Sequence, residues 1–106
     1  MISFEEFAKV ELKTGKVLSA EPVEGSEKLI KLMVDIGEDT PRQVLVGIAK
    51  FYSPEQLTGR TIIVAANLKP RMIMGLESQG MILAADGKKP IPLTTFEETK
   101  LGSKIR

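Results

Sequence analysis

Five segments with β-strand character, interrupted once by a helix, constrain the fold of this chain most. Polar and apolar residues alternate in these segments, or β-branched residues dominate, as is typical of strands. The segments cover residues 11–20, 29–37, 42–49, 61–67 and 79–85. A helix signal lies between the third and the fourth, with Ser53 as N-cap, Pro54 at the first helical position and Gln56 three residues after the cap. The sequence therefore predicts three strands, one short helix and two further strands.

The first of these segments carries a glycine, Gly15, near its middle. A glycine inside a long strand favours a bend, which a closed barrel requires. The predicted element order is that of the five-stranded Greek-key barrel known as the oligonucleotide/oligosaccharide-binding (OB) fold. We therefore expect an all-β OB-fold barrel over about residues 11–85, in preference to a plain β-sandwich. All 106 residues are expected to form one domain.

Two extensions flank the predicted barrel. In residues 1–10, Ser3 and Glu6 have the spacing of a capping box, so a short helix is expected there. In residues 86–106, Pro90 and Pro92 favour an extended segment at a sheet edge. A barrel of this size has little spare core with which to cover the apolar side chains of both extensions, so we expect a homodimer that buries them. These side chains are Ile2, Phe4, Phe7, Ile91, Leu93, Phe96, Leu101 and Ile105.

The composition excludes most catalytic constellations. The chain has no Cys and no His, which removes thiolate nucleophiles, zinc-thiolate sites and imidazole bases. Carboxylates and lysines remain, but without a spacing typical of sugar hydrolysis or Schiff-base chemistry. We therefore expect a non-catalytic protein with no cofactor and no metal site.

Hydropathy and charge predict a cytoplasmic protein without a membrane partner. No apolar run approaches the roughly 20 residues of a membrane span, and the acidic Glu5, Glu6 and Glu11 do not fit a signal peptide. The net charge of +1 conceals an asymmetry, since residues 42–89 hold seven basic side chains against three acidic ones. The isoelectric point of about 7.9 is nevertheless below that of a uniformly basic nucleic-acid binder, so a polyanion site would have to be a local patch.

The stretch from 67 to 85 carries the main candidate binding residues. Lys69 and Arg71 flank Pro70, which stiffens the loop and presents two cations suited to phosphate. Small polar groups that could bond phosphate or a ribose hydroxyl follow at Asn67, Ser78 and Gln79. The alternative is an ordinary solvated loop.

Two further residues of this stretch have a structural interpretation. Met81 is expected to fill core space, although it could also be a soft ligand contact. Glu77 is expected to be an internal ion-pair partner of Arg71 or Lys69 rather than a catalytic acid.

A second group of candidates lies earlier in the chain. It comprises Lys16, Ser26, Lys28 and Lys31, and an ordinary surface position is the alternative for each of the lysines. Only Phe51 and Tyr52 among the aromatic residues lie near the predicted barrel. Single-strand binders of this fold stack bases on aromatic side chains, so the sequence favours the backbone and shape of a folded RNA.

At NLKPRMIMGLESQGMILAA (67–85) the chain closely resembles the tRNA-binding domain appended to the C-terminus of many methionyl-tRNA synthetases. The segments ELKTGKV (11–17), EGSEKLIKL (24–32) and QVLVGIAKFYSPEQLTGR (43–60) support this resemblance. A free-standing structure-specific tRNA-binding protein and the C-terminal domain of endothelial monocyte-activating polypeptide share the same module. The resemblance covers nearly the whole chain.

The resemblance implies an OB-fold homodimer that binds the outer corner of tRNA with little preference for tRNA identity. It also implies a partner, the catalytic core of methionyl-tRNA synthetase, either fused to this domain or separate. The family's nucleic-acid-binding positions correspond here to Lys16, Ser26, Lys28, Lys31, Asn67, Lys69, Arg71, Ser78, Gln79 and Met81. The family frequently has a further basic residue where this chain has Met74, which shifts the expected contacts onto Lys69 and Arg71.

Two other functions stay open on the sequence. A secretion-chaperone-like relative of the same fold would bind unfolded peptide in an apolar groove. A domain that only dimerises would bind neither RNA nor peptide.

Overall fold

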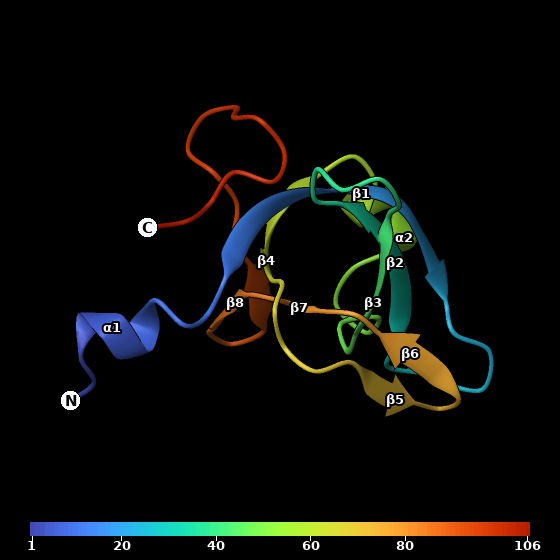
Figure 1. Ribbon diagram of the computed structural model, residues 1–106. Helices are drawn as coiled ribbons and strands as arrows, with labels where there is room; N and C mark the ends of the chain where they lie inside the picture. The colour runs from blue at the N-terminus through green and yellow to red at the C-terminus, as the bar shows by residue number, and fades with distance from the viewer.

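Strand β1 is the strand on which the barrel is built, because it pairs with two different neighbours. The computed structural model describes residues 1–106. The first half of β1 (Leu12–Pro22) pairs antiparallel with β4 (Thr61–Ala65), and its second half pairs antiparallel with β2 (Ile30–Asp35). The register shifts between Val17 and Ser19, which marks a bulge after the point where β1 changes partner. Figure 1 shows the long curved β1 running across one side of the ring of strands.

The remaining strands complete a nearly closed barrel. The five-stranded sheet has the order β3-β2-β1-β4-β7. The other elements are α1 (Phe4–Phe7), β3 (Arg42–Val46), α2 (Pro54–Leu57), β5 (Arg71–Ile73), β6 (Leu76–Ser78), β7 (Met81–Ile82), β8 (Ala84–Asp86) and β9 (Pro90–Pro92). The helix α2 lies between the third and the fourth strand of the barrel, and its Ser53 N-cap and Gln56 form a capping box. The predicted OB-fold barrel is confirmed.

The backbone of β1 lies very close to core side chains at Gly15. A Cβ atom at this position would lie 2.8 Å from Val34 Cγ1 and 3.0 Å from Ile36 Cγ2. Because a glycine brings no side chain, the backbone of β1 can approach these core residues of β2 and its continuation. The prediction that the first strand bends at a glycine is consistent with this close approach.

The core follows the alternation of the strands. In β2, Ile30, Leu32 and Val34 are buried while the residues between them are half-buried. β3 and β4 contribute further aliphatic side chains to the same cluster. The core cluster comprises Val17, Ile30, Leu32, Val34, Ile36, Val44, Val46, Ile48, Leu57, Ile62, Val64, Ala66 and Ile82. The sheet therefore closes around one aliphatic core, without an aromatic side chain among its fully buried members.

A polar cluster centred on Arg42 joins β3 to the strands across the barrel. The Arg42 Nη1 group donates to the carbonyl oxygens of Ala66 and Gln79, the latter at 3.0 Å. Its Nε and Nη2 groups donate to the two carboxylate oxygens of Glu38, both at 2.8 Å. Beside them, the Gln79 backbone N–H donates to the Gln43 carbonyl at 2.7 Å, and the Gln43 N–H donates to Gln79 Oε1 at 2.9 Å. These contacts close the gap between β3 and β7.

The structure corrects one of the predicted elements. The expected fifth strand, 79–85, is divided into β7 and β8, because the chain leaves the barrel after Ile82 and pairs with β9. The stretch after β4, expected to be a loop with some extended structure, contains the hairpin β5–β6, which turns at Met74 and Gly75 with positive φ values of 50° and 79°. β9 lies at the edge of its two-stranded sheet, as Pro90 and Pro92 predicted.

The N-terminal extension leaves the barrel with its apolar side chains uncovered. The predicted capping box of α1 is confirmed, since the Glu6 N–H donates to Ser3 Oγ at 3.1 Å and the Ser3 N–H to Glu6 Oε1 at 3.2 Å. None of the residues of α1 is buried, and Phe4 is 75 % exposed. In Figure 1, α1 projects away from the barrel on the side opposite to the β5–β6 hairpin.

The C-terminal segment folds back onto its own barrel. The buried Thr14 of β1 is bonded to this segment four times, including its hydroxyl donating to the Lys100 carbonyl at 3.0 Å and its N–H donating to the Ser103 carbonyl at 3.0 Å. Gly102 allows the crossing, because its φ is +81° and a Cβ there would collide with the Ile36 carbonyl. Leu101 and Ile105 are consequently half-buried within this chain. The barrel of the same chain therefore already covers part of the surface of these two residues.

We predict that Arg42→Met lowers the free energy of unfolding by about 1 to 3 kcal/mol, because it removes charged hydrogen bonds to two backbone carbonyls. Chemical denaturation of both proteins measures the difference. Arg60→Met is the matched control, since Arg60 is exposed and its side chain forms no hydrogen bond or ion pair. Equal stability of Arg42→Met and the unmodified protein would contradict this role.

The pH dependence of the free energy of unfolding measures how much the Arg42–Glu38 ion pair contributes to stability. The Arg42 guanidinium, mainly through its hydrogen bonds, holds the pKa of Glu38 below its usual value. A carboxyl group whose pKa is lower in the folded than in the unfolded chain stabilises the fold above the unfolded pKa of about 4.3, and this contribution is lost as the pH falls through the folded pKa. Glu38→Gln should therefore be less stable than the unmodified protein at pH 7, with the difference narrowing below about pH 4.

Candidate nucleic-acid interface

A small hollow lies between the β5–β6 hairpin, β3 and the start of β7. Its lining comes from three parts of the chain that only the folded barrel brings together, and its volume is about 120 Å³. The lining residues are Leu45, Leu68, Lys69, Arg71, Ile73, Ser78, Gly80 and Met81. Four of the predicted site residues, namely Lys69, Arg71, Ser78 and Met81, thus meet at one place.

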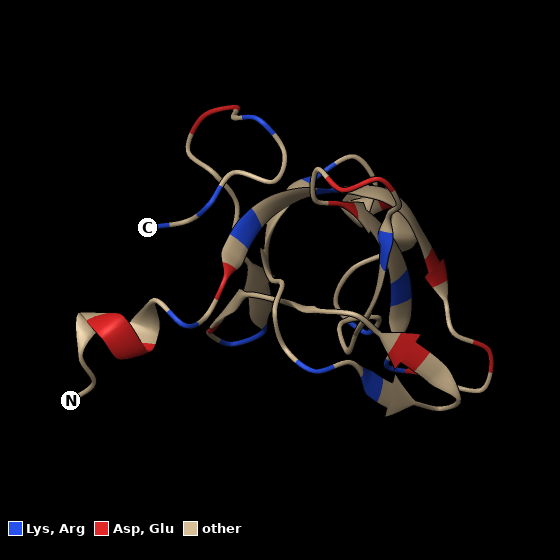
Figure 2. Cartoon of the chain, viewed as in Figure 1, with Lys and Arg blue, Asp and Glu red and all other residues tan.

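Two cations without an acidic partner stand at the rim of this hollow. Lys69 and Arg71 are exposed, and the two ion pairs of the structure, Lys31–Glu21 and Arg42–Glu38, involve neither of them. In Figure 2, blue for Lys and Arg marks the loop that leads into β5 and part of β5 itself. The prediction that Glu77 pairs with Arg71 or Lys69 is wrong. The hairpin register places Glu77 opposite Met72 and Arg71 opposite Ser78, so that Glu77 and Arg71 point to different faces of the hairpin.

Ser78 and Gln79 hold the hairpin beside β3 through hydrogen bonds within the protein. Ser78 is buried, and its hydroxyl accepts from the Leu45 N–H at 3.0 Å and donates to the Gly80 carbonyl at 3.0 Å. Gln79 is bonded to Gln43 through its backbone N–H and its side-chain oxygen. These two residues attach the hairpin to β3 and thereby hold Arg71 in place.

Asn67 has a similar structural role at the end of β4. Its Oδ1 accepts from the Glu11 N–H at 2.8 Å, and its Nδ2 donates to the Lys9 carbonyl at 2.7 Å. Both ends of the amide are therefore used to fix the N-terminal arm against the loop that carries Lys69.

Met81 is not a core residue. It lies 49 % exposed in the lining of the hollow, whereas its neighbour Ile82 is buried. The expectation that Met81 fills core space is wrong because β7 alternates, and position 82 rather than 81 faces the barrel interior. Met81 instead offers a soft apolar surface beside the two cations.

The second group of candidates lies on β1, β2 and the loop between them. Lys31 pairs with Glu21 at 2.6 Å and lies opposite Leu45 in the register, which places its strand position next to the hollow. Ser26 caps its own loop, with its Oγ accepting from the N–H groups of Lys28 and Leu29 at 3.2 and 3.0 Å. Lys28 and Lys16 are exposed, and no contact joins them to the hollow.

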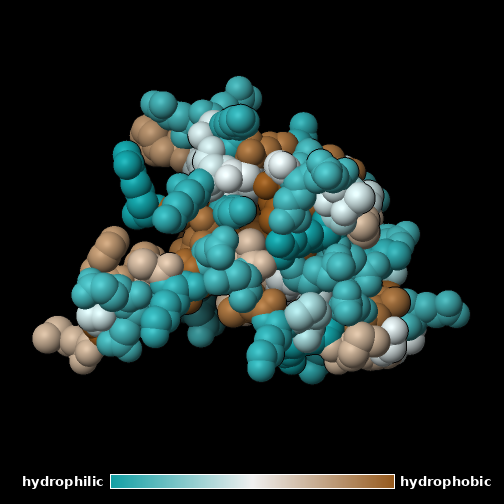
Figure 3. All heavy atoms as spheres, in the orientation of Figure 1, coloured by the Kyte–Doolittle hydropathy of each residue, from teal (hydrophilic) through white to brown (hydrophobic).

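The apolar floor of the hollow is not apparent from the sequence. Leu45, Leu68 and Ile73 line it. Of these, only Leu45 departs from the expected sequence pattern in a way that could have indicated the floor. It is an apolar residue between Val44 and Val46, at a position where an alternating strand would have a polar one. In Figure 3, apolar atoms bordered by hydrophilic side chains are visible around the hairpin and at the N-terminal arm.

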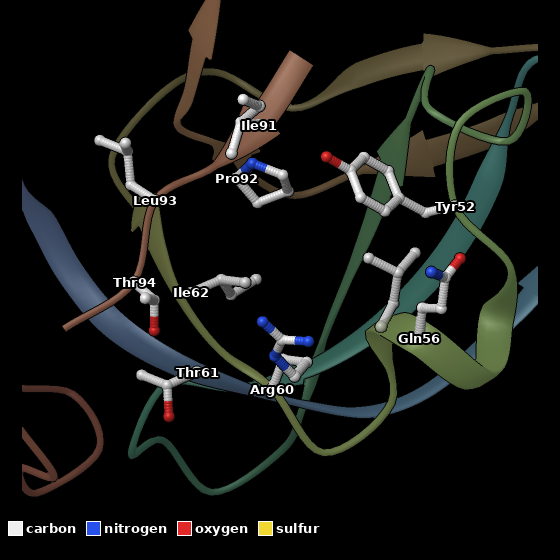
Figure 4. A pocket seen from close by; sticks show the side chains of 10 residues that line it. Tyr52, Gln56, Arg60, Thr61, Ile62, Ile91, Pro92, Leu93 and Thr94 are labelled. Carbon is white, nitrogen blue, oxygen red and sulfur yellow. The ribbon is translucent and has the colours of Figure 1, made fainter. Parts of the chain in front are cut away.

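A larger cavity of about 240 Å³ lies between α2, β4 and the segment around β9. Figure 4 shows Tyr52, Arg60, Ile62, Ile91 and Leu93 around it. The Tyr52 hydroxyl donates to the Pro90 carbonyl at 2.9 Å, and the Lys89 ammonium lies 4.9 Å from the centre of the Tyr52 ring. These contacts attach the β8–β9 hairpin to the barrel and leave the cavity open beside Ile91 and Leu93.

None of the helices has the length and apolar character needed to cross a membrane.

Residues 12–104 match the protein family described as "Putative tRNA binding domain". The methionine–tRNA ligase of Methanocella arvoryzae is 51 % identical over 105 residues, which are 99 % of this chain and 15 % of that enzyme. The methionine–tRNA ligase of Archaeoglobus fulgidus is 51 % identical over 106 residues, or 98 % of this chain and 16 % of the enzyme. The chain therefore spans about one sixth of the length of these relatives.

Two solved structures are similar over the whole chain. The MetRS related protein from Pyrococcus horikoshii has a TM-score of 0.93 and 37 % identity, with 100 % of this chain and 98 % of that one covered. The chaperone CsaA from Bacillus anthracis has a TM-score of 0.90 and 30 % identity, with 100 % and 99 % covered. The sequence comparisons and the structural comparisons agree on one family. This chain belongs to the tRNA-binding domain family that also forms part of methionine–tRNA ligases.

Proposed function

We propose that this chain is a non-catalytic module that binds the outer corner of tRNA without strong preference for tRNA identity. In this role residues 1–106 act as one domain, which raises the tRNA affinity of a methionyl-tRNA synthetase catalytic core, either fused to it or acting in trans. The observation that carries the proposal is the pair Lys69 and Arg71, two exposed cations without an acidic partner at the rim of the hollow. The family match supports the same ligand.

The predicted site residues divide into two roles under this proposal. Lys69, Arg71 and Met81 contact the RNA directly, and Lys16, Lys28 and Lys31 extend the basic surface along the neighbouring strands. Asn67, Ser78, Gln79 and Ser26 act through the backbone that they fix, since their side chains are already engaged within the protein. Phosphate contacts of this kind position an RNA without identifying its sequence.

Peptide binding is the second candidate function. The likeness to the chaperone CsaA and the apolar floor of the hollow favour it. The two unpaired cations favour RNA, because an apolar peptide gives them no counter-charge. Direct competition between bulk tRNA and an unfolded apolar peptide decides between the two.

Binding of tRNA should be electrostatic and nearly indifferent to identity. If about four to six phosphates are neutralised, the logarithm of the binding constant should fall against the logarithm of the salt concentration with a slope of about −3 to −5. Two different elongator tRNAs should compete within a few-fold of each other in a filter-binding assay. A hundredfold preference for one anticodon would contradict this function.

Arg71→Ala should weaken tRNA binding by about 1 to 3 kcal/mol, because a guanidinium can grip phosphate with two parallel hydrogen bonds. The thermal midpoint should stay nearly unchanged, since the Arg71 side chain forms no bond within the protein. Arg60→Ala is the matched control, an exposed arginine that lines the other cavity. Parallel loss of stability and binding in Arg71→Ala would show a structural role instead.

We further propose that the protein acts as a homodimer through its extensions. Phe4, Phe7, Ile91, Leu93 and Phe96 remain exposed, whereas Leu101 and Ile105 are half-buried. The exposed group lies away from the β5–β6 hairpin, so a dimer would leave both RNA sites open (Figure 1). Two sites on one particle raise the apparent affinity, because the second contact becomes intramolecular.

Sedimentation equilibrium should give about 23 kDa, which is twice the chain mass of 11.6 kDa. The double variant Phe4→Asp with Phe96→Asp should sediment as a monomer and bind tRNA at least tenfold more weakly. These point changes are preferable to deletion from Pro90 onward, because the deletion would also remove the segment that is bonded to Thr14. Phe51→Asp, at an exposed phenylalanine outside the two extensions, is the control, and normal tRNA binding by a monomer would refute the proposal.

A further inference from the structure

We propose that the hollow beside the β5–β6 hairpin receives the base of one unstacked nucleotide of the bound RNA, while Arg71 and Lys69 hold its phosphate. This inference rests on the proposed tRNA binding and adds which part of the RNA enters the site. Four features of the hollow carry it: its cations, its apolar floor, its size and the state of its polar groups.

The cations define one end of the ligand. Lys69 and Arg71 lie next to each other across Pro70, and both are exposed at the rim of the hollow. Glu77 lies on the other face of the hairpin, opposite Met72. The rim therefore offers two positive charges that an anionic group can neutralise, and a phosphate suits the planar guanidinium of Arg71.

The floor defines the other end of the ligand. Leu45 is buried there, whereas Met81 and Leu68 are 49 % and 43 % exposed. A phosphate alone would leave this apolar surface in water, at a cost that rises with its area. A nucleotide carries an apolar base face and an anionic phosphate in one unit, and the Met81 thioether can make favourable contacts with an aromatic ring.

The size of the hollow limits the ligand to one ring system. Its volume of about 120 Å³ is far below the roughly 300 to 1,000 Å³ of ordinary ligand pockets. A base inside a stem is paired and stacked on its neighbours, so only a nucleotide of a loop or bulge can be splayed into such a hollow. The occupant that follows is a single unpaired nucleotide of a folded RNA.

The polar groups of the lining indicate that the base is held without being identified. Ser78 is the one uncharged polar side chain in the lining, and its hydroxyl is already bonded to the Leu45 N–H and the Gly80 carbonyl. No free side-chain amide or hydroxyl is left there to recognise a base edge. Adenine and uracil should therefore be accepted with affinities within a few-fold of each other.

The first test separates the base contact from the phosphate contact by salt dependence. Met81→Ala should weaken tRNA binding about two- to tenfold through loss of the sulfur contact with the base, with the salt slope unchanged. Arg71→Ala should also reduce the magnitude of the salt slope by about one. Met72→Ala is the matched control, because this methionine is 67 % exposed on the opposite face of the same hairpin, and it should bind tRNA like the unmodified protein.

The second test uses small probes and the amide NMR signals of the full chain. Adenosine 5′-monophosphate and uridine 5′-monophosphate should shift the signals of Lys69, Arg71, Leu45 and Met81. Inorganic phosphate should shift the signals of Lys69 and Arg71 but leave those of Leu45 and Met81 unchanged. Excess tRNA should displace either nucleotide from the protein.

The outcomes distinguish this inference from the proposed function. If tRNA binds normally but Met81→Ala has no effect and the nucleotides shift only Lys69 and Arg71, the base site is refuted while tRNA binding stands. If the unmodified protein does not retain tRNA at all, the proposed function fails first. If an unfolded apolar peptide shifts Leu45 and Met81 and tRNA does not displace it, the hollow is a peptide site and the inference is overturned.

Discussion

The closure of the barrel between β3 and β7 is the interaction on which the candidate site depends. Arg42 donates to the carbonyl groups of Ala66 and Gln79, and Gln43 exchanges hydrogen bonds with Gln79. Only two residues of β7 pair with β4, so the sheet alone holds this strand weakly. The polar contacts fix both ends of the segment from Ala66 to Gln79, and that segment carries Lys69 and Arg71. A basic loop that would otherwise be free is thereby given a defined position.

Most of the small polar residues near the hollow form hydrogen bonds within the protein and are therefore not free to bind a ligand. Ser78 bonds β3, and Asn67 bonds the N-terminal arm. Their carbonyl, amide and hydroxyl groups satisfy backbone groups that would be costly to leave unpaired. The groups left for a ligand are two cations and an apolar floor, which together suit a ligand that is anionic on one side and apolar on the other.

The two sides of the molecule have different characters. One side presents the β5–β6 hairpin with its cations, and the other presents α1 with exposed phenylalanines (Figures 1 and 2). The C-terminal segment crosses β1 at Thr14 and covers part of its own barrel, away from the hairpin (Figure 1). An RNA and a second copy of the chain could therefore be bound without competing for the same surface.

The sequence by itself determined the order of the barrel strands and of the helix between them, and it showed which loop carries the cations. Alternating apolar residues, the Ser53 and Ser3 caps and the bend at Gly15 are local signals, because each depends on residues a few positions apart. Only the tertiary structure decided what lies around Arg71. The separation of Glu77 from Arg71 depends on the hairpin register, and the exposure of Met81 depends on which face of β7 turns inward. The floor of the hollow depends on Leu45 meeting Ser78 across 33 positions of the chain, a contact that no local pattern encodes.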